Sequence, residues 1–167
     1  MKEKETLFLQ LINQHKAIIH KVSKMYMDDV EEQRDLFQEI VMQLWKAYPT
    51  FKGNSKFSTW MYRVALNTAL LYFKKEKRKV EQTPLDEHFD VIDNNENNLK
   101  EEKLAYLYKA VQELNAVEKA LIFLFLENQS HREIAENLGI SEVNARVKLN
   151  RTKEKLQFII KKNGYEF

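Results

Sequence analysis

The sequence predicts an all-α protein in which two small helical bundles are joined by an acidic linker, and three observations predict it. Only three Gly and two Pro occur among 167 residues, too few for the tight turns of a β-sandwich or barrel. Hydrophobic residues make up 44% of the chain and recur at helical spacing in both halves. Charge is segregated: residues 1–79 carry +6, residues 80–104 carry −6 and residues 105–167 carry +2. We therefore expect domains at 1–79 and 104–167, with a linker at 80–103.

Three helices are expected in residues 1–79. In the first, from Thr6 to about Tyr26, the apolar residues near helical spacing are Leu7, Leu11, Ile12, Ile18, Ile19 and Val22. Asp28 or Asp29 caps a second helix that ends near Tyr48, with an inner face that includes Leu36, Ile40, Leu44 and Ala47. A loop with Gly53 in its turn follows. Ser58 or Thr59 then caps a third helix, whose inner stripe is Met61, Val64, Ala65, Thr68 and Leu71.

The second half begins after the polar, weakly periodic segment 84–98, which is typical of a linker. A helix starts near Leu99 and continues to about Leu114, and another spans 116–126. A short helix follows Ser130 and a long one follows Ser141. The positions of the long helix that face inward are Ala145, Leu149, Thr152 and Leu156.

Residues 130–157 carry the sharpest motif, a helix-turn-helix. Ser130 and Glu133 have the spacing of a capping box, Gly139 suits a left-handed helix end, and Ser141 can cap the next helix. The long helix then presents short polar groups to base edges and cations to phosphates. The candidate DNA-contacting residues are Arg132, Ser141, Val143, Asn144, Arg146, Val147, Lys148 and Arg151, with Lys153 a further phosphate candidate. The alternative is a solvated helical hairpin.

Residues 51–63 interleave aromatic, basic and small polar residues. Aromatic rings can stack on unpaired bases while nearby cations hold the backbone, so this stretch can bind single-stranded nucleic acid. The alternative is that Phe57, Trp60 and Tyr62 are simply core residues, and the sequence alone leaves both interpretations open.

Asp35 and Glu39 lie one helical turn apart, with Gln38 beside them. No His is near in sequence and no metal-ligand spacing is present, so a face for a basic partner or plain solvent exposure explains them better than a metal site. The chain has no Cys, which excludes disulfides and thiolate ligands. Without a catalytic dyad, metal cluster or phosphate loop, we expect no enzyme, no cofactor, no metal and no small-molecule substrate.

The longest apolar run is seven residues, 120–126, against the roughly 20 that span a bilayer, and the first residues do not resemble a signal peptide. A cytoplasmic protein is therefore expected.

Three segments carry a family resemblance: Asp35-Leu36-Phe37-Gln38-Glu39 with Leu44-Trp45, then residues 57–67 beginning Phe57-Ser58-Thr59-Trp60, then residues 133–141 followed by a basic helix. In this order they resemble the extracytoplasmic-function (ECF) sigma factors of bacterial RNA polymerase. The resemblance covers nearly the whole chain. It implies two helical domains and a DNA-binding protein that binds core polymerase, recognises promoter DNA and promotes transcription initiation.

The resemblance also implies roles for residues. The residues that it implies for docking on polymerase are Asp35, Gln38, Glu39, Leu44 and Trp45. The minus-ten promoter element would be melted, and its exposed non-template strand captured, by Lys52, Asn54, Lys56, Ser58, Trp60, Tyr62, Arg63 and Asn67. Residues 141–153 match the helix that reads the minus-thirty-five duplex, the linker is expected to thread toward the RNA-exit path, and an anti-sigma factor is the expected regulator. Ala145, Thr152 and Val147 depart from the family's usual residues.

Two alternatives remain. A helix-turn-helix regulator that is not a polymerase subunit would leave the Asp35 face and the aromatic loop unexplained. An RNA-binding or nucleic-acid-processing enzyme lacks any catalytic constellation in the sequence.

Overall fold

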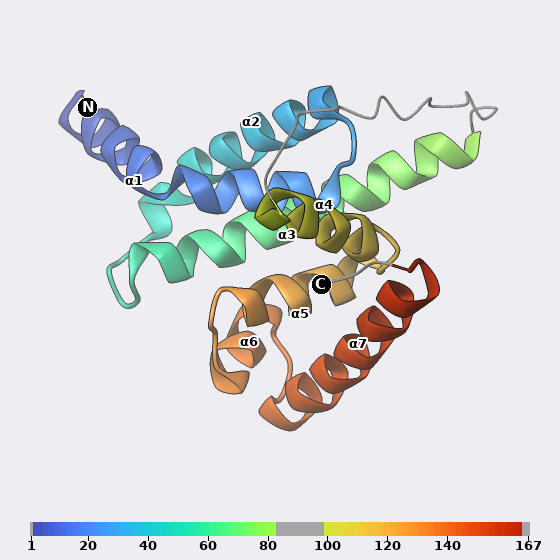
Figure 1. Ribbon diagram of the computed structural model, residues 1–167. Helices are drawn as coiled ribbons and strands as arrows, with labels where there is room; N and C mark the ends of the chain where they lie inside the picture. The colour runs from blue at the N-terminus through green and yellow to red at the C-terminus, as the bar shows by residue number, and fades with distance from the viewer. Residues whose placement is uncertain (1, 83–98, 165–167) are drawn as a thin grey trace.

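The computed structural model describes residues 2–82 and 99–164, and within them it contains helices and no strands (Figure 1). The acidic segment 84–98, and with it the expected path of the linker, lies outside the described residues. In chain order the elements are α1 (Lys2–Tyr26), α2 (Val30–Ala47), the 3-10 turn η1 (Tyr48–Thr50), α3 (Phe57–Gln82), α4 (Leu99–Gln112), α5 (Ala116–Leu126), α6 (His131–Leu138) and α7 (Glu142–Lys162). The all-α prediction is confirmed.

The first three helices pack around a shared apolar core. Its fully buried side chains include Ile19, Val22, Leu36, Ile40, Leu44 and Met61. Asp29, one of the two predicted caps, begins α2, because its carboxylate accepts a hydrogen bond from the Glu32 backbone N–H at 3.3 Å. The helix α3 begins at Phe57, before either of the predicted caps.

Two predicted inner positions are wrong. Leu7 is 52% exposed, because the neighbouring Phe8 takes the inward position of α1. Leu71 is 71% exposed, because the buried stripe of α3 runs through Ala65 and Ala69, which places residue 71 on the opposite side of the helix.

The last four helices form the second bundle, and their ends follow local rules. The predicted bounds of α5 are confirmed, and Asn115 and Glu118 form a complete reciprocal capping box that the sequence analysis missed. Ser130 and Ser141 cap α6 and α7 as predicted, and Gly139 ends α6 with φ +68°. The buried face of α7 contains all four predicted residues, Ala145, Leu149, Thr152 and Leu156.

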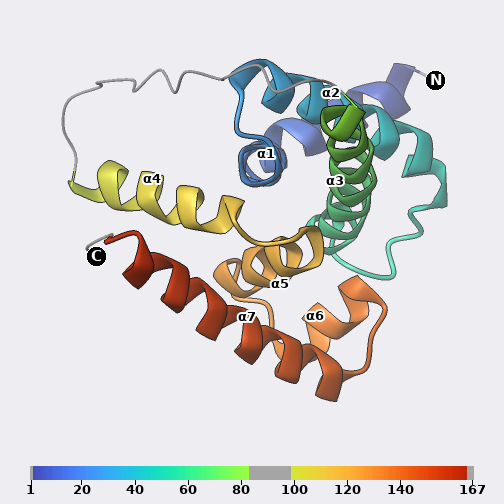
Figure 2. The same ribbon diagram turned by 90° about the vertical axis from the view of Figure 1, so that its right-hand side faces the viewer.

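The two bundles pack directly against each other. The helices α4 and α5 contact α1, while α5 and α6 contact α3 (Figure 2). The hydrophobic core is therefore continuous from Ile19 in the first bundle to Phe123 and Ile134 in the second. This packing decides which faces of the candidate DNA-contacting helices are open to solvent.

Candidate nucleic-acid interface

The helices α6 and α7 form the predicted helix-turn-helix, and all eight of its candidate contact residues have exposed side chains. Val143 is 67% exposed and Val147 is 40% exposed, although both are apolar. Arg132 pairs with Glu136 at 3.4 Å and Arg146 with Glu142 at 3.9 Å. Such exposed pairs contribute little to stability, so both guanidinium groups can exchange partners for a polyanion.

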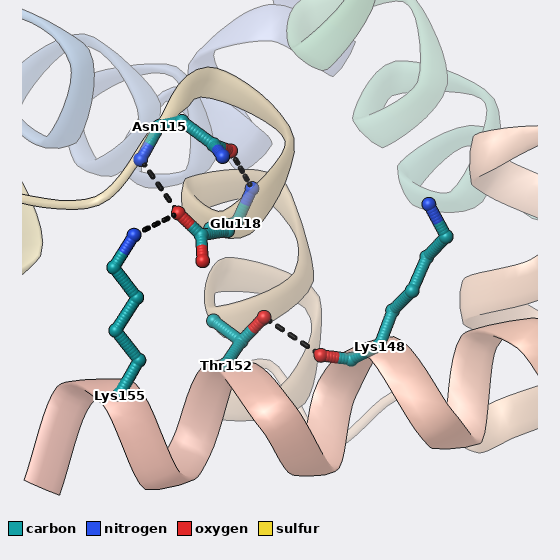
Figure 3. Close-up of polar contacts among 5 residues, drawn as sticks. All are labelled: Asn115, Glu118, Lys148, Thr152 and Lys155. Atoms are coloured by element: carbon teal, nitrogen blue, oxygen red, sulfur yellow. Dashed lines mark hydrogen bonds and ion pairs between the residues drawn. The ribbon is translucent and has the colours of Figure 1, made fainter.

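Two of these cations also face the first bundle. Lys148 and Arg151 line a cleft of about 980 Å³ between the bundles, across from Phe73 and Lys74 of α3. Figure 3 shows Lys148 and Lys155 extending from the same side of α7, while the Thr152 hydroxyl donates to the Lys148 carbonyl at 2.7 Å. The second bundle therefore turns part of its cationic face toward the first.

Lys153 does not join this cationic face. Its ammonium lies 3.8 Å from the centroid of the Phe125 ring, and its side chain is half-buried. A cation held on a ring face inside its own bundle is less available to phosphate. Lys155 is also engaged within its own bundle, because it pairs with Glu118 at 2.9 Å (Figure 3).

The aromatic residues before and within α3 pack on one another. Phe51 contacts Phe57 with ring centroids 5.7 Å apart and Trp60 at 5.2 Å, while Tyr48 completes the cluster. All four rings are half-buried. The rings therefore pack on one another and still keep part of their surface open to solvent, so both interpretations of this stretch remain compatible with the structure.

The polar residues of this segment surround the cluster. Lys52, Asn54 and Lys56 are exposed on the loop, Ser58 is half-buried, and Arg63 and Asn67 are exposed on α3. Gly53 makes the predicted turn with φ +75°. The loop thus carries exposed cationic and polar side chains, and Arg63 and Asn67 lie one turn apart on α3.

Tyr62 differs from the prediction. Its side chain is 7% exposed, its hydroxyl donates to Glu127 Oε2 at 3.1 Å, and its ring meets Phe123 at 5.8 Å. Burial and then the charge of Glu127 raise the pKa of Tyr62 to about 12. In this arrangement Tyr62 joins the two bundles and is closed to nucleic acid.

The candidate docking face on α2 is only partly as predicted. Asp35, Gln38 and Trp45 are exposed, and Glu39 is half-buried, where it accepts a hydrogen bond from Gln43 Nε2 at 3.0 Å. Leu44, however, is fully buried, so it supports the face from below and offers no contact surface. Leu44 lies one helical turn after Ile40 and two turns after Leu36. Its side chain therefore points into the core, as theirs do.

Sequence reasoning missed an apolar groove beside this face. The groove, of about 500 Å³, lies between α1 and α2 and is lined by Glu5, Phe8, Leu9, Phe37, Gln38, Val41, Met42 and Trp45. Leu9 is 56% and Met42 45% exposed. Apolar residues lying off the inner stripe of both helices were the signal that could have revealed it.

The segment 11–79 matches the family described as Sigma-70 region 2, and the segment 104–156 matches Sigma-70, region 4. Together the two matches cover most of the chain in the order of the two bundles. The chain belongs to the sigma-70 family. Region 2 corresponds to α1–α3 and region 4 to α4–α7, with residues 80–103 between the two matched segments.

Its relatives place it among the ECF sigma factors. It is 28% identical to the ECF RNA polymerase sigma factor SigX of Bacillus subtilis over 122 residues, which is 68% of this chain and 63% of SigX. It is also 28% identical to the ECF RNA polymerase sigma-E factor of Escherichia coli K12 over 132 residues, 72% of this chain and 69% of that protein.

Two solved structures share the fold. The first is the sigma factor RpoE in complex with the anti-sigma factor NepR from Bartonella quintana, with a TM-score of 0.71, 18% identity and coverage of 96% of this chain and 98% of that one. The second is CnrH in complex with the cytosolic domain of CnrY, with a TM-score of 0.67, 17% identity and coverage of 94% and 89%. Regions 2 and 4 are thus both represented in the fold match.

Within residues 2–82 and 99–164, no helix combines the length and apolar character that crossing a membrane requires. In the same residues, no three His, Asp or Glu side chains gather closely enough to hold a metal ion.

Proposed function

We propose that this chain is a promoter-specificity subunit: it joins core RNA polymerase in the cytoplasm, recognises promoter DNA and promotes transcription initiation. The observation that carries the proposal is the presence, in one chain, of both matched sigma-70 regions, each with an exposed polar and cationic face. Such a subunit contributes binding and positioning, and the polymerase supplies the chemistry.

Region 4 is proposed to bind the minus-thirty-five duplex through α7. The exposed Asn144 and Arg146 suit base edges in the major groove, and Val143 suits a thymine methyl group. Lys148 and Arg151 suit phosphates, with Arg132, Ser141 and Val147 at the borders of the same face. Each phosphate neutralised contributes about −0.9 to the slope of log affinity against log salt.

Region 2 is proposed to capture the minus-ten element. Lys52, Asn54 and Lys56 hold the backbone, while the accessible surface of Trp60, with Ser58, Arg63 and Asn67, meets bases released by melting. Tyr62 can take part only after region 4 withdraws, because its hydroxyl and ring are occupied by Glu127 and Phe123.

Core polymerase is proposed to dock on α2. Asp35, Gln38 and Glu39 supply an acidic and polar edge, and Trp45 lies in the adjoining apolar groove. An acidic edge beside an apolar groove fits a partner surface that is basic around an apolar centre. An anti-sigma factor is proposed as a second partner, by analogy with the structural neighbour that is bound to one.

The test is run-off transcription from a genomic fragment library with core polymerase, with and without the chain, followed by sequencing of the transcript starts. We expect the chain to redirect initiation to a discrete set of starts that share two upstream elements. A pull-down with core polymerase runs in parallel. DNA binding without core association would instead assign the chain to the regulators that are not polymerase subunits.

A further inference from the structure

The end of α1 is capped by side chains from the other bundle. Gln112 of α4 donates from Nε2 to the Met25 carbonyl at 2.9 Å and to the Lys24 carbonyl at 3.2 Å. Lys119 of α5 donates from Nζ to the same Met25 carbonyl at 3.2 Å. The last carbonyls of a helix have no partner within it and carry partial negative charge, so they suit a cation. Region 4 supplies that cation to a helix of region 2.

The ammonium of Lys119 is fully enclosed. The residue has no exposed surface, and Nζ lies 4.6 Å from the centroid of the Phe73 ring and 5.6 Å from that of Tyr26. Gln112 Oε1 accepts a second hydrogen bond from Nζ at 3.1 Å. Two hydrogen bonds and two ring faces replace the water that a buried cation loses. Of these partners, Met25, Tyr26 and Phe73 belong to the opposite bundle.

A second polar cluster lies farther along the same interface. Glu127 accepts from Lys21 Nζ at 2.9 Å and from the Tyr62 hydroxyl at 3.1 Å, and Lys24 lies over the Tyr108 ring at 4.6 Å. The Tyr26 hydroxyl donates to the Ala116 carbonyl at 2.7 Å. Direct hydrogen bonds that cross the interface fix one relative placement of the two bundles.

We infer that Lys119 is an interdomain latch that loss of a proton tightens: its side-chain nitrogen seats on the end of α1 only when the bundles are closed, so any separation of the bundles transfers this lysine into water. The closed arrangement is thereby a property of the chain itself. It buries Tyr62 and turns Lys148 and Arg151 into the cleft, so opening precedes their use on DNA; that consequence, unlike the latch, rests on the proposed function.

The equilibrium between closed and open bundles should depend on pH, because closure changes the pKa of Lys119. Burial lowers the pKa of Lys119 from 10.5 to about 8, opposed by the charge of Asp28. Opening restores hydration, so the open arrangement binds the proton more tightly between those values, and rising pH favours closure. From pH 7 to 9.5 the ratio of closed to open molecules should rise about 25-fold, given a pKa of about 8 closed and 10.5 open.

Other groups that face Lys119 come from every surrounding element. Burial raises the pKa of Tyr26 in α1, so its phenol stays neutral over this range. The charged groups lining the neighbouring cleft are Asp28, Glu32, Lys74, Glu76, Glu113, Glu118, Lys148, Arg151 and Lys155. A variant without the lysine amine separates its contribution from theirs.

The experiment is single-molecule energy transfer on the full chain, without polymerase or DNA. Because the sequence has no Cys, Lys16→Cys in α1 and Gln157→Cys in α7 provide unique dye sites at exposed positions. We expect one high-transfer population. Lys119→Glu should increase the open fraction at least about tenfold, since its carboxylate faces the Met25 and Gln112 oxygens. Lys109→Glu, the same charge change at an exposed lysine, is the matched control and should leave the fraction unchanged.

Lys119→Met tests the proton linkage and guards against misfolding. Methionine keeps most of the length of the side chain without its charge, so this variant should fold and lose most of the pH dependence. The pH series is measured on proteins that also carry Glu127→Gln. Loss of the second polar cluster should raise the open fraction to a level that can be measured at each pH. A largely open wild type, a folded Lys119→Glu protein that stays as closed as Lys109→Glu, or a pH dependence that Lys119→Met leaves unchanged would each overturn the latch. None of these outcomes bears on whether the chain directs transcription.

Discussion

Single residues determine where the helices of region 4 begin and end. Asn115, Ser130 and Ser141 each accept a hydrogen bond from the backbone N–H three residues later, at 2.9 to 3.1 Å. Gly139 closes α6 in the left-handed region. These local contacts orient α7 on α6, so the geometry of the helix-turn-helix depends on a few positions.

Gly139→Ala is expected to destabilise region 4 by about 1 kcal/mol, because a side chain at φ +68° is strained. No atom lies within 4 Å of the added methyl group, so the cost comes from the backbone alone. Urea unfolding followed by circular dichroism measures it. Asn150→Ala, at an exposed position of α7, is the control, and an equal effect of the two changes would contradict this explanation.

Arg63→Ala is expected to impair promoter opening more than closed-complex formation, because Arg63 is exposed on the face of α3 proposed to meet melted DNA. Trp60→Ala should act in the same direction, with added loss of packing against Phe51. Permanganate reactivity of unpaired thymines measures opening, and filter binding of the holoenzyme measures closed complexes. Lys75→Ala is the control on the same helix. Equal loss of both steps in Arg63→Ala would reject the assignment.

At the scale of elements, α2 separates two roles on two faces. Its inner face places Leu36, Ile40 and Leu44 in the core, and its outer face carries Asp35, Gln38 and Trp45. A change on the outer face can therefore alter partner binding without removing core contacts.

Asp35→Arg combined with Glu39→Arg is expected to abolish binding to core polymerase while circular dichroism shows an intact fold. Reversing both charges places cations against a partner surface proposed to be basic. The matched control is Glu101→Arg with Glu154→Arg, two exposed acids on α4 and α7. Binding that survives the first pair, measured by pull-down, would refute docking on this face.

The helices themselves were largely predictable, because their signals are local. Residues 116–126 gave the bounds of α5, and Ser141 gave the start of α7. Leu7 was misplaced because Leu7 and Phe8 are both apolar, and only packing shows which side chain points inward.

The candidate site was less predictable where it depends on contacts distant in sequence. Exposure of the outer face of α7 follows from helical spacing, and the residues expected to point outward there are exposed: Val143, Asn144, Arg146, Val147, Lys148, Asn150 and Arg151. Tyr62 has the same local pattern as Trp60, yet Phe123 and Glu127 from the other half of the chain bury it. The roles of these residues on DNA and polymerase stay predictions.

At the scale of the whole molecule, the interface between the bundles combines apolar contact with buried polar groups. Tyr62, Lys119 and Tyr26 each donate a hydrogen bond to the opposite bundle, and each is buried. The pKa of a buried tyrosine or lysine depends on the groups packed around it. Titration of these residues therefore reports whether the interface is closed.

Tyr62 is expected to ionise near pH 12 in the native protein. The neutral phenol is favoured by burial and by its bond to Glu127, so this stabilisation is present below pH 10 and is lost as the pH rises toward 12. Absorbance at the tyrosinate band, compared with Tyr62→Phe, isolates this group. Glu127→Gln should lower the pKa only in part, because burial is the larger cause. A Tyr62 that titrates at 10 would show that the interface is open in solution.

The hydrogen bonds that Gln112 and Lys119 make to the final turn of α1 have a practical consequence for dissecting the molecule. A fragment that stops after α3 would leave the carbonyls of Lys24 and Met25 to water, and the apolar surface around Met25 and Tyr26 uncovered. Its N-terminal helix should fray at that end, and amide exchange there should accelerate relative to the intact protein. Measurements on such a fragment would therefore describe a less stable end of α1 than the one in the full-length protein.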